Sequence, residues 1–415
     1  MAAILNPVSK CCIVAVVVVD GTDDEDGKVW LSQQQERHRQ MSSSGSHGSI
    51  NYYETSMEEN FVKPQPQNLD YHETERNILY LSGPEGFSTM LSSSTVDAVF
   101  VITPSASQLT QTYVWEALQA RKHVLLRDRI SAEYEVFMRQ LKCATELGCL
   151  VQSSTLFVSY HRVKTFLDSV QSEKFGGIHL INAKLIINFN DAEKVGASNP
   201  LIHTDGCIKR LGRFCVLVSI LLLSRTGSTP VSAQVTHAVM QNVRDEEADQ
   251  EVAIPVEADC VVRFSNGEIL SCNVAYSFIA TRQVLTVQAR DRYANMTDFV
   301  IPHPDGLATY RIYDKEVNPV TGKLEVVKGE ALDVLSGPPV EVMMWRRFAD
   351  LSREVEQEGY SSPRTAGALE MAKLTIQTKR VLLALEESLV LRKEVPVTMP
   401  DLTWPNIAAG RAKTT

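Results

Sequence analysis

The chain has 415 residues, of which 44% are hydrophobic and 22% are charged, and its formal net charge is −9 at pH 7. This is the composition of a soluble globular protein, and the length predicts two or more domains, because single cores stop growing near about 250–300 residues. The acidic balance, without a stripe of lysine and arginine, excludes nucleic acid from the expected partners.

The longest apolar runs, 11–19 and 214–223, are too short for a membrane-spanning helix, which needs about 20 residues, so no membrane partner is expected. The first run resembles a signal-peptide core, but no small-residue cleavage site follows it, and we interpret it as a buried strand. The eight cysteines form no CxxC pair, so no metal site is expected. Cys260 and Cys272 flank a predicted hairpin and could come close. The cysteines are nevertheless expected to be buried free thiols of a reducing compartment, which indicates a cytoplasmic protein.

The first part of the chain alternates between predicted strands and helices. Residues 11–19 are rich in β-branched side chains and end at Asp20-Gly21, as a buried parallel strand does. A helix is predicted over 28–41, and the polar residues 42–76 are interpreted as an insertion or a long loop. The alternation resumes with strands over 77–82, 96–104, 123–127 and 149–154, and with helices over 85–93, 108–121 and 131–148.

This alternation predicts a Rossmann-like, nucleotide-binding type of domain over residues 1–155, with a parallel sheet and right-handed crossovers. Ligands of such sheets bind beyond the carboxyl ends of the strands. Arg127, Asp128 and Arg129 directly follow the buried run that ends at Leu126. We therefore expect them at a cofactor or substrate crevice, although a solvated strand end would carry charges as well.

Residues 156–395 are predicted to form an α+β domain with an open, mostly antiparallel sheet and helices on one face, followed by a tail over 396–415. Asn266-Gly267, between two alternating runs, predicts a hairpin with a type I′ turn. The predicted strands are 177–190, 231–240, 258–266, 268–278 and 282–290, and the predicted helices are 161–173, 207–224, 340–359 and 365–392.

Several stretches together resemble the Gfo/Idh/MocA oxidoreductases. These are "VDAVFVITP" (96–104), "EALQARKHVLL" (116–126), the turn at Tyr160-His161-Arg162 and "FGGIHLINAKLIINF" (175–189). The resemblance implies a dehydrogenase fold, NAD or NADP as cofactor, and a small-molecule substrate such as a sugar or a polyol. It further implies cofactor contacts from Thr103, Pro104, Arg127 and Asp128, and a homo-oligomer formed through the open sheet.

The chain departs from the family pattern where the resemblance places catalysis. Asp128 stands at the position of the family lysine and cannot act as a cation. In "RLGRFCV" (210–216), Arg210 replaces the family aspartate, Gly212 is kept, and Phe214 or a neighbour falls where an acid–base ring is expected. Gln108 replaces a histidine after Thr103-Pro104. These departures predict impaired or altered catalysis.

The glycine-rich turn that usually lets the backbone approach a pyrophosphate is not found in the sequence. In one interpretation, 11–19 is the first strand of the domain, and the acidic stretch 20–27 replaces the glycine turn and repels phosphate. In the other, 11–19 is the second strand, and Asp20 contacts the adenosine ribose. The sequence leaves both open.

Replacement catalytic groups are available in "LIHTDGCIKRLG" (201–212), and they are His203, Asp205 and Lys209. His203 could serve as a base near neutral pH, but all three would also fit a surface loop. The functional hypotheses are therefore a working oxidoreductase and a catalytically impaired relative. The alternative is a non-catalytic nucleotide-binding or scaffold subunit of the same fold.

Overall fold

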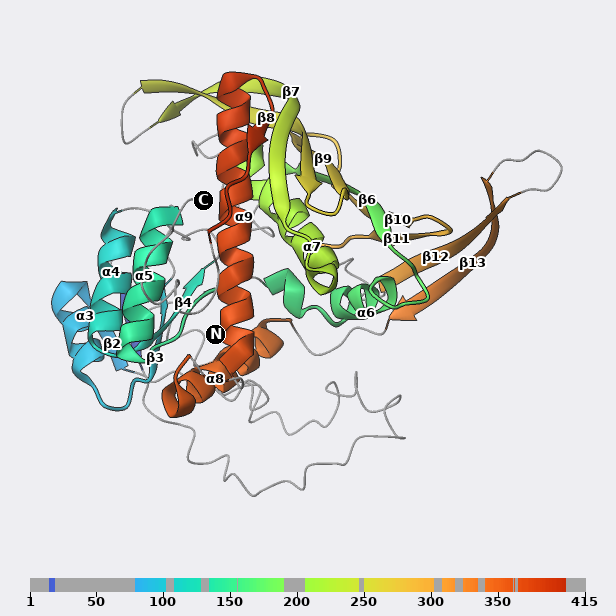
Figure 1. Ribbon diagram of the computed structural model, residues 1–415. Helices are drawn as coiled ribbons and strands as arrows, with labels where there is room; N and C mark the ends of the chain where they lie inside the picture. The colour runs from blue at the N-terminus through green and yellow to red at the C-terminus, as the bar shows by residue number, and fades with distance from the viewer. Residues whose placement is uncertain are drawn as a thin grey trace, which may run out of the picture. The chain divides into compact units, whose positions relative to one another are not determined.

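The computed structural model describes residues 15–18, 79–101, 108–127, 134–154, 156–189, 206–245, 250–301, 308–317, 324–334, 340–360, 362 and 365–400. The chain divides into two compact units, Met1–Asp97 and Ala98–Thr415 (Figure 1). The helix predicted over 28–41 and the insertion predicted over 42–76 lie outside the described residues.

The described residues of the first unit form two short parallel strands and one helix. Strand β1 (Ala15–Val18) pairs with β2 (Leu79–Ser82), and helix α3 (Gly83–Ser92) contacts both strands. The helix buries Phe87, Met90 and Leu91, which are spaced three and four residues apart on one face. Both predicted ranges contain a strand within their described residues.

A second parallel sheet opens the larger unit. Strands β3 (Ala98–Val101), β4 (His123–Arg127) and β5 (Val151–Ser154) lie in the order β3-β4-β5. Helices α4 (Gln108–Gln119) and α5 (Tyr134–Leu147) connect them. The Nδ1 atom of His123 accepts a hydrogen bond of 2.9 Å from the backbone N–H of Leu150, which joins the starts of β4 and β5. These repeated strand–helix units confirm the Rossmann-like part of the predicted fold class.

The large sheet has nine described strands in the order β13-β12-β11-β10-β6-β9-β8-β7-β14. All neighbours are antiparallel except β6 and β9, which confirms an open, mostly antiparallel sheet. The strands are β6 (Ile178–Asn188), β7 (Pro230–Asp245), β8 (Gln250–Phe264), β9 (Ile269–Ser277), β10 (Arg282–Ala289), β11 (Arg292–Thr297), β12 (Ala308–Val317), β13 (Leu324–Val334) and β14 (Val395–Pro396).

Helices cover one face of this sheet and form its core. Helix α7 (Arg213–Leu223) contacts β6 and β9, and the long helix α9 (Ala366–Leu391) contacts β7 and α7 (Figure 1). Helix α7 is apolar on all sides and is buried along almost its whole length, because the sheet lies on one side and α9 on another. Helix α6 (His161–Val170) contacts α7 and β13, whereas α8 (Val340–Glu358) contacts α9 and packs Trp345 against Phe100 of β3.

The hairpin between β8 and β9 is confirmed, but the predicted type I′ turn is wrong. A type I′ turn needs positive φ at both central residues, whereas Gly267 has φ +92° and Asn266 does not share this conformation. The Gly267 N–H donates to the Phe264 carbonyl, so the turn begins one residue earlier than expected. The hydroxyl of Ser228 accepts a hydrogen bond from the Asn266 N–H and holds the turn in this register.

Cys260 and Cys272 lie opposite one another on β8 and β9, and both are buried free thiols. No helix among the described residues is long and apolar enough to cross a membrane. In the same part of the chain, no three His, Cys, Asp or Glu side chains are grouped so that they could hold a metal ion.

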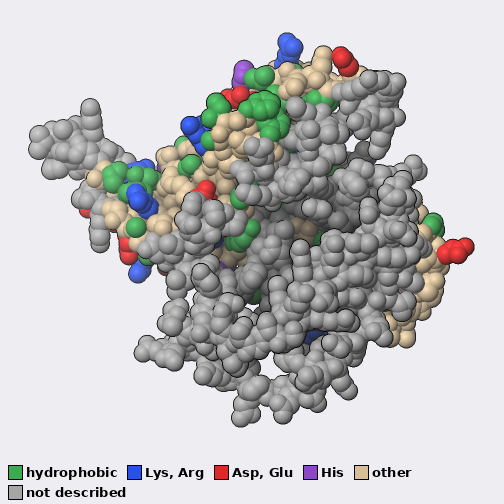
Figure 2. All heavy atoms as spheres, turned by 180° about the vertical axis from the view of Figure 1, so that it is seen from behind, with side chains coloured by type: hydrophobic (Ala, Val, Ile, Leu, Met, Phe, Trp, Pro, Cys, Tyr) green, Lys and Arg blue, Asp and Glu red, His purple; other side chains and the backbone are tan. Residues whose placement is uncertain are grey.

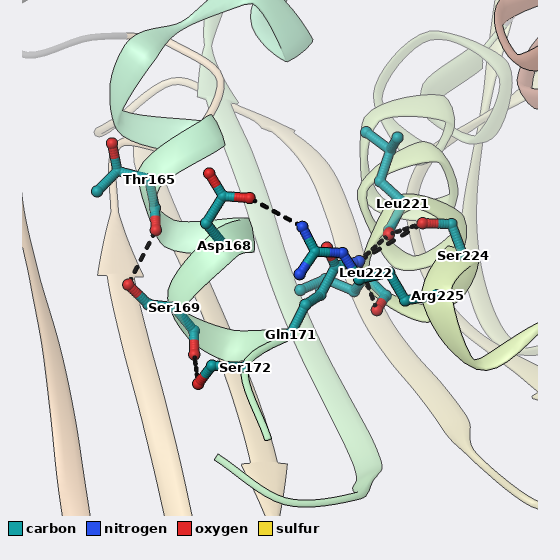
Figure 3. A network of polar contacts seen from close by, with 9 residues as sticks. All are labelled: Thr165, Asp168, Ser169, Gln171, Ser172, Leu221, Leu222, Ser224 and Arg225. Carbon is teal, nitrogen blue, oxygen red and sulfur yellow. Dashed lines mark hydrogen bonds and ion pairs between the residues drawn. The ribbon is translucent and has the colours of Figure 1, made fainter. Parts of the chain in front are cut away.

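A polar network joins the end of α6 to the end of α7 (Figure 3). The Nε2 atom of Gln171, just after α6, donates to the carbonyls of Leu221 at 2.6 Å and of Leu222 at 3.0 Å. These belong to the last turn of α7, where carbonyls lack the usual helical N–H partner. The Leu221 carbonyl also accepts from the N–H and the hydroxyl of Ser224. Beside them, the exposed Arg225 and Asp168 form an ion pair of 3.1 Å. Helix α6 therefore ends three residues earlier than predicted, and the side chain of Gln171, just after it, caps the end of α7.

We expect Gln171→Met to destabilise the protein by about 1–2 kcal/mol, because the partly buried carbonyls of α7 lose their donor. Arg225→Gln, in the same network, should change the free energy of unfolding by no more than about 1 kcal/mol, because its ion pair is exposed. Urea denaturation of both variants measures the difference. Equal effects would show that Gln171 contributes no more than a surface contact.

Candidate functional site

The carboxyl ends of the parallel strands lie next to one another in the larger unit. Arg127, the last residue of β4, pairs with Ser154 at the end of β5, and the preceding Leu126 pairs with Val101 at the end of β3. This is the edge at which open parallel sheets bind their ligands. Arg127 therefore ends its strand at this edge, and its contact with a cofactor stays a prediction.

Most of the other predicted site residues fall outside the described part of the chain. This applies to Asp20, Thr103, Pro104, Asp128, His203 and Asp205, so their roles stay predictions. Lys209 is the one predicted site residue with a described side chain.

Lys209 lies on a short π-helix (Ile208–Gly212) that leads into α7. Its Nζ atom forms an ion pair of 2.8 Å with the Oε1 atom of Glu386 on α9. Both side chains are partly exposed, at 47% and 33%. This ion pair joins the π-helix to α9, so a structural role accounts for the position of the Lys209 side chain.

The start of this segment is fixed by a glycine. Gly206 has φ +62°, and a Cβ atom built on it would lie 2.6 Å from the Cδ atom and 3.0 Å from the carbonyl oxygen of Pro255 on β8. No side chain larger than hydrogen fits without displacing β8 or the helix. The segment 206–212 is therefore held tightly at the point where it enters the core.

Phe214 belongs to the hydrophobic core. Its ring is only 7% exposed, and the guanidinium of Arg213 lies 4.5 Å from the ring centroid. The position at which the resemblance places an acid–base side chain thus holds a buried ring without an ionisable proton. Arg210 lies on the π-helix that leads into α7, which begins with Arg213 and Phe214.

Buried polar groups gather where β5 ends, which sequence reasoning missed. Gln152 and Ser153 are buried, and the described residues provide no hydrogen-bond partner for the Gln152 Oε1 atom or the Ser153 Oγ atom. Buried polar atoms usually have a partner, so unpaired ones at a strand end fit a ligand edge. The only sequence signal was the polar ending of "CLVQSS" (149–154).

A shallow pocket of about 470 Å³ lies on the outer face of the large sheet, away from α7. Tyr293 and Tyr313 stack in it at 4.4 Å between ring centroids, and Tyr313 rests against the bare backbone of Gly329. The side chains that line it alternate along β11 and β12 and are Tyr293, Asn295, Thr297, Thr309, Arg311 and Tyr313.

Comparisons with known proteins indicate the class of fold. By sequence, no protein-family model and no curated protein matches the chain. By structure, the chain is similar to a 3-ketoreductase from Actinomadura kijaniata in complex with NADP and TDP-benzene, with 17% identity and a TM-score of 0.56. That match covers 76% of this chain and 85% of the other. An oxidoreductase from Pseudomonas syringae matches at 11% identity and a TM-score of 0.55, with 75% and 82% of the two chains covered. The fold is therefore that of NADP-binding oxidoreductases.

We expect Gly206→Ala to destabilise the protein by roughly 1–3 kcal/mol more than Gly176→Ala. Both glycines have positive φ, at +62° and +86°, but a Cβ atom at Gly176 meets nothing within 4 Å. The comparison therefore cancels the backbone strain and isolates the clash with Pro255. Thermal and urea unfolding measure the two variants. If the two variants are equally stable, β8 moves away from the added Cβ atom without loss of stability, and the segment 206–212 is not tightly held.

Proposed function

We propose that the protein binds NAD or NADP as a relative of the Gfo/Idh/MocA oxidoreductases, and that its catalysis is impaired. The proposal includes a nucleotide-binding domain over residues 1–155 and a second domain over residues 156–395. The observation that carries it is Phe214, which is buried in the core where the resemblance expects an acid–base side chain. The alternative is a non-catalytic nucleotide-binding or scaffold subunit.

The dinucleotide would be held at the carboxyl ends of β3, β4 and β5. The unpaired buried atoms of Gln152 and Ser153 support this placement, together with Thr103, Pro104 and Asp128 in the loops that follow the strands. When bound, the cofactor supplies the hydride. The chain must then supply a proton donor or acceptor near the substrate. His203 and Asp205 are the remaining candidates for that role, since Lys209 is ion-paired with Glu386.

Titration with NAD⁺, NADH, NADP⁺ and NADPH tests the binding. A nucleotide at 100 times its dissociation constant adds about 2.7 kcal/mol to the free energy of unfolding, which a thermal-shift assay detects. We expect a shift with at least one nucleotide and little turnover of polyols or sugars. Without any shift, the scaffold alternative is favoured; with rapid turnover, impairment is refuted.

Asp128→Lys tests the role assigned to the family lysine. We expect tighter nucleotide binding or a gain of turnover, because the new ammonium can attract the cofactor and serve as a proton donor. Asp128→Asn is the matched control, since it removes the negative charge without adding a cation. If both variants bind nucleotide like the original protein, Asp128 does not border the crevice.

We further propose that a second copy of the chain covers the outer face of the large sheet. Arg311 and Lys315 lie on β12, while Glu257 and Asp259 lie on β8, and five steps of strand order separate these strands. Figure 2 shows basic and acidic side chains together on the described parts of the surface. A half-turn about an axis between β10 and β6 would place β12 of one copy over β8 of the other, which pairs opposite charges twice.

Charge exchange tests this interface. Arg311→Glu and Asp259→Arg should each shift the protein toward monomer, and the double variant should restore the dimer, as measured by light scattering after size exclusion. Arg290→Glu, at a side chain that is 94% exposed and outside this strand pair, should have no effect. A dimer that survives both single variants, or a double variant that remains monomeric, would contradict the arrangement.

A further inference from the structure

The start of helix α6 combines two features that favour an anion. The first N–H groups of any helix point out of its end without partners. At α6, the residue before the helix is Tyr160, and no side chain caps these N–H groups. The helix is ten residues long, so its dipole also favours negative charge at this end. A helix N-terminus alone does not define a binding site, but at α6 a buried charged side chain of the same helix accompanies it.

Arg162 lies in the first turn of the same helix and is only 7% exposed. The described residues provide no hydrogen-bond partner for its Nε and Nη2 atoms, and no described carboxylate forms an ion pair with it. Its Cζ atom lies 4.9 Å from the centroid of the Tyr160 ring. The guanidinium is therefore directed back to the open end of the helix, above the residue that precedes it.

A guanidinium buried without an anionic partner is unfavourable, because burial removes its hydration. Burial accordingly lowers the pKa of Arg162, while Tyr160 and Asp298 act in the opposite direction. Asp298 has a left-handed backbone conformation, with φ +52°. The side-chain oxygen of Gln283 accepts hydrogen bonds from backbone N–H groups of the segment that follows Asp298. Asp298 raises the pKa of Arg162, but among the described residues it forms no ion pair with the guanidinium.

We propose that the start of α6 is a binding site for a phosphate group, held by the Arg162 guanidinium and by the first N–H groups of the helix. The planar fork of an arginine matches two phosphate oxygens, and helix N-termini bind phosphate through their N–H groups. Helix α6 also follows β5 after a short connection, so its start lies beyond the carboxyl end of a strand of the parallel sheet.

Arg162→Met tests the proposal, because methionine keeps the apolar volume and removes the buried charge. In chloride buffer, we expect this variant to melt at the same temperature as the original protein or higher. Inorganic phosphate at equal ionic strength should raise the melting temperature of the original protein and leave that of Arg162→Met unchanged. Arg225→Met, an exposed arginine beyond the other end of α6, should keep the phosphate response.

Calorimetric titration with inorganic phosphate and with uridine diphosphate distinguishes a free ion from a phosphate ester. Binding of either supports the site, and Arg162→Lys should bind roughly tenfold more weakly, because it keeps the charge without the fork. The proposal is overturned if neither ligand binds the original protein, or if Arg162→Met lowers the melting temperature in chloride, as the loss of a purely structural arginine would. The titrations with nicotinamide cofactors are a separate measurement, so the proposed cofactor binding and the proposed phosphate site can each fail without the other.

Discussion

Burial of the apolar helix α7 is the constraint on which the rest of the larger unit depends. The helix has no polar face, so it is stable only with the sheet on one side and other helices on another. The residues just before it must then enter the core at a fixed point, which explains the left-handed Gly206 against Pro255. The ion pair of Lys209 with Glu386 fixes the same segment to α9. The candidate site is thus built on a rigid support.

This support also limits the chemistry. Hydride transfer at a carbinol needs a group that gives or takes a proton near neutral pH. The segment that leads into α7 offers Arg210 and Arg213, which carry only hydrogen-bond donors, and Phe214, which has no ionisable proton. Side chains of this kind can bind and orient an anionic group. The proposed acid–base roles of His203 and Asp205, in the preceding loop, stay predictions.

The sequence was most informative where one physical signal dominated. Alternating apolar residues located β8, β9 and β10, and the glycine at 148 ended α5 as expected, with φ +70°. Strands β12 and β13 were missed. In β12, charged side chains such as Arg311 and Lys315 cover the outer face, and few apolar residues point inward. The hairpin turn was wrong because a contact from Ser228, distant in sequence, selects its register.

The candidate site was less predictable than the fold, for a reason that Arg162 makes clear. An arginine in a polar stretch such as "SYHRVK" (159–164) is exposed in most proteins. Its burial is not visible in the local sequence, and its electrostatic environment includes Asp298, far along the chain. Neither periodicity nor composition records whether a buried charge finds a partner. Motif comparison does not detect such a charge either, since it considers the residues that a family shares. The functional chemistry of a divergent chain is therefore better sought among its unpaired buried charges than among the positions where its relatives keep their catalytic groups.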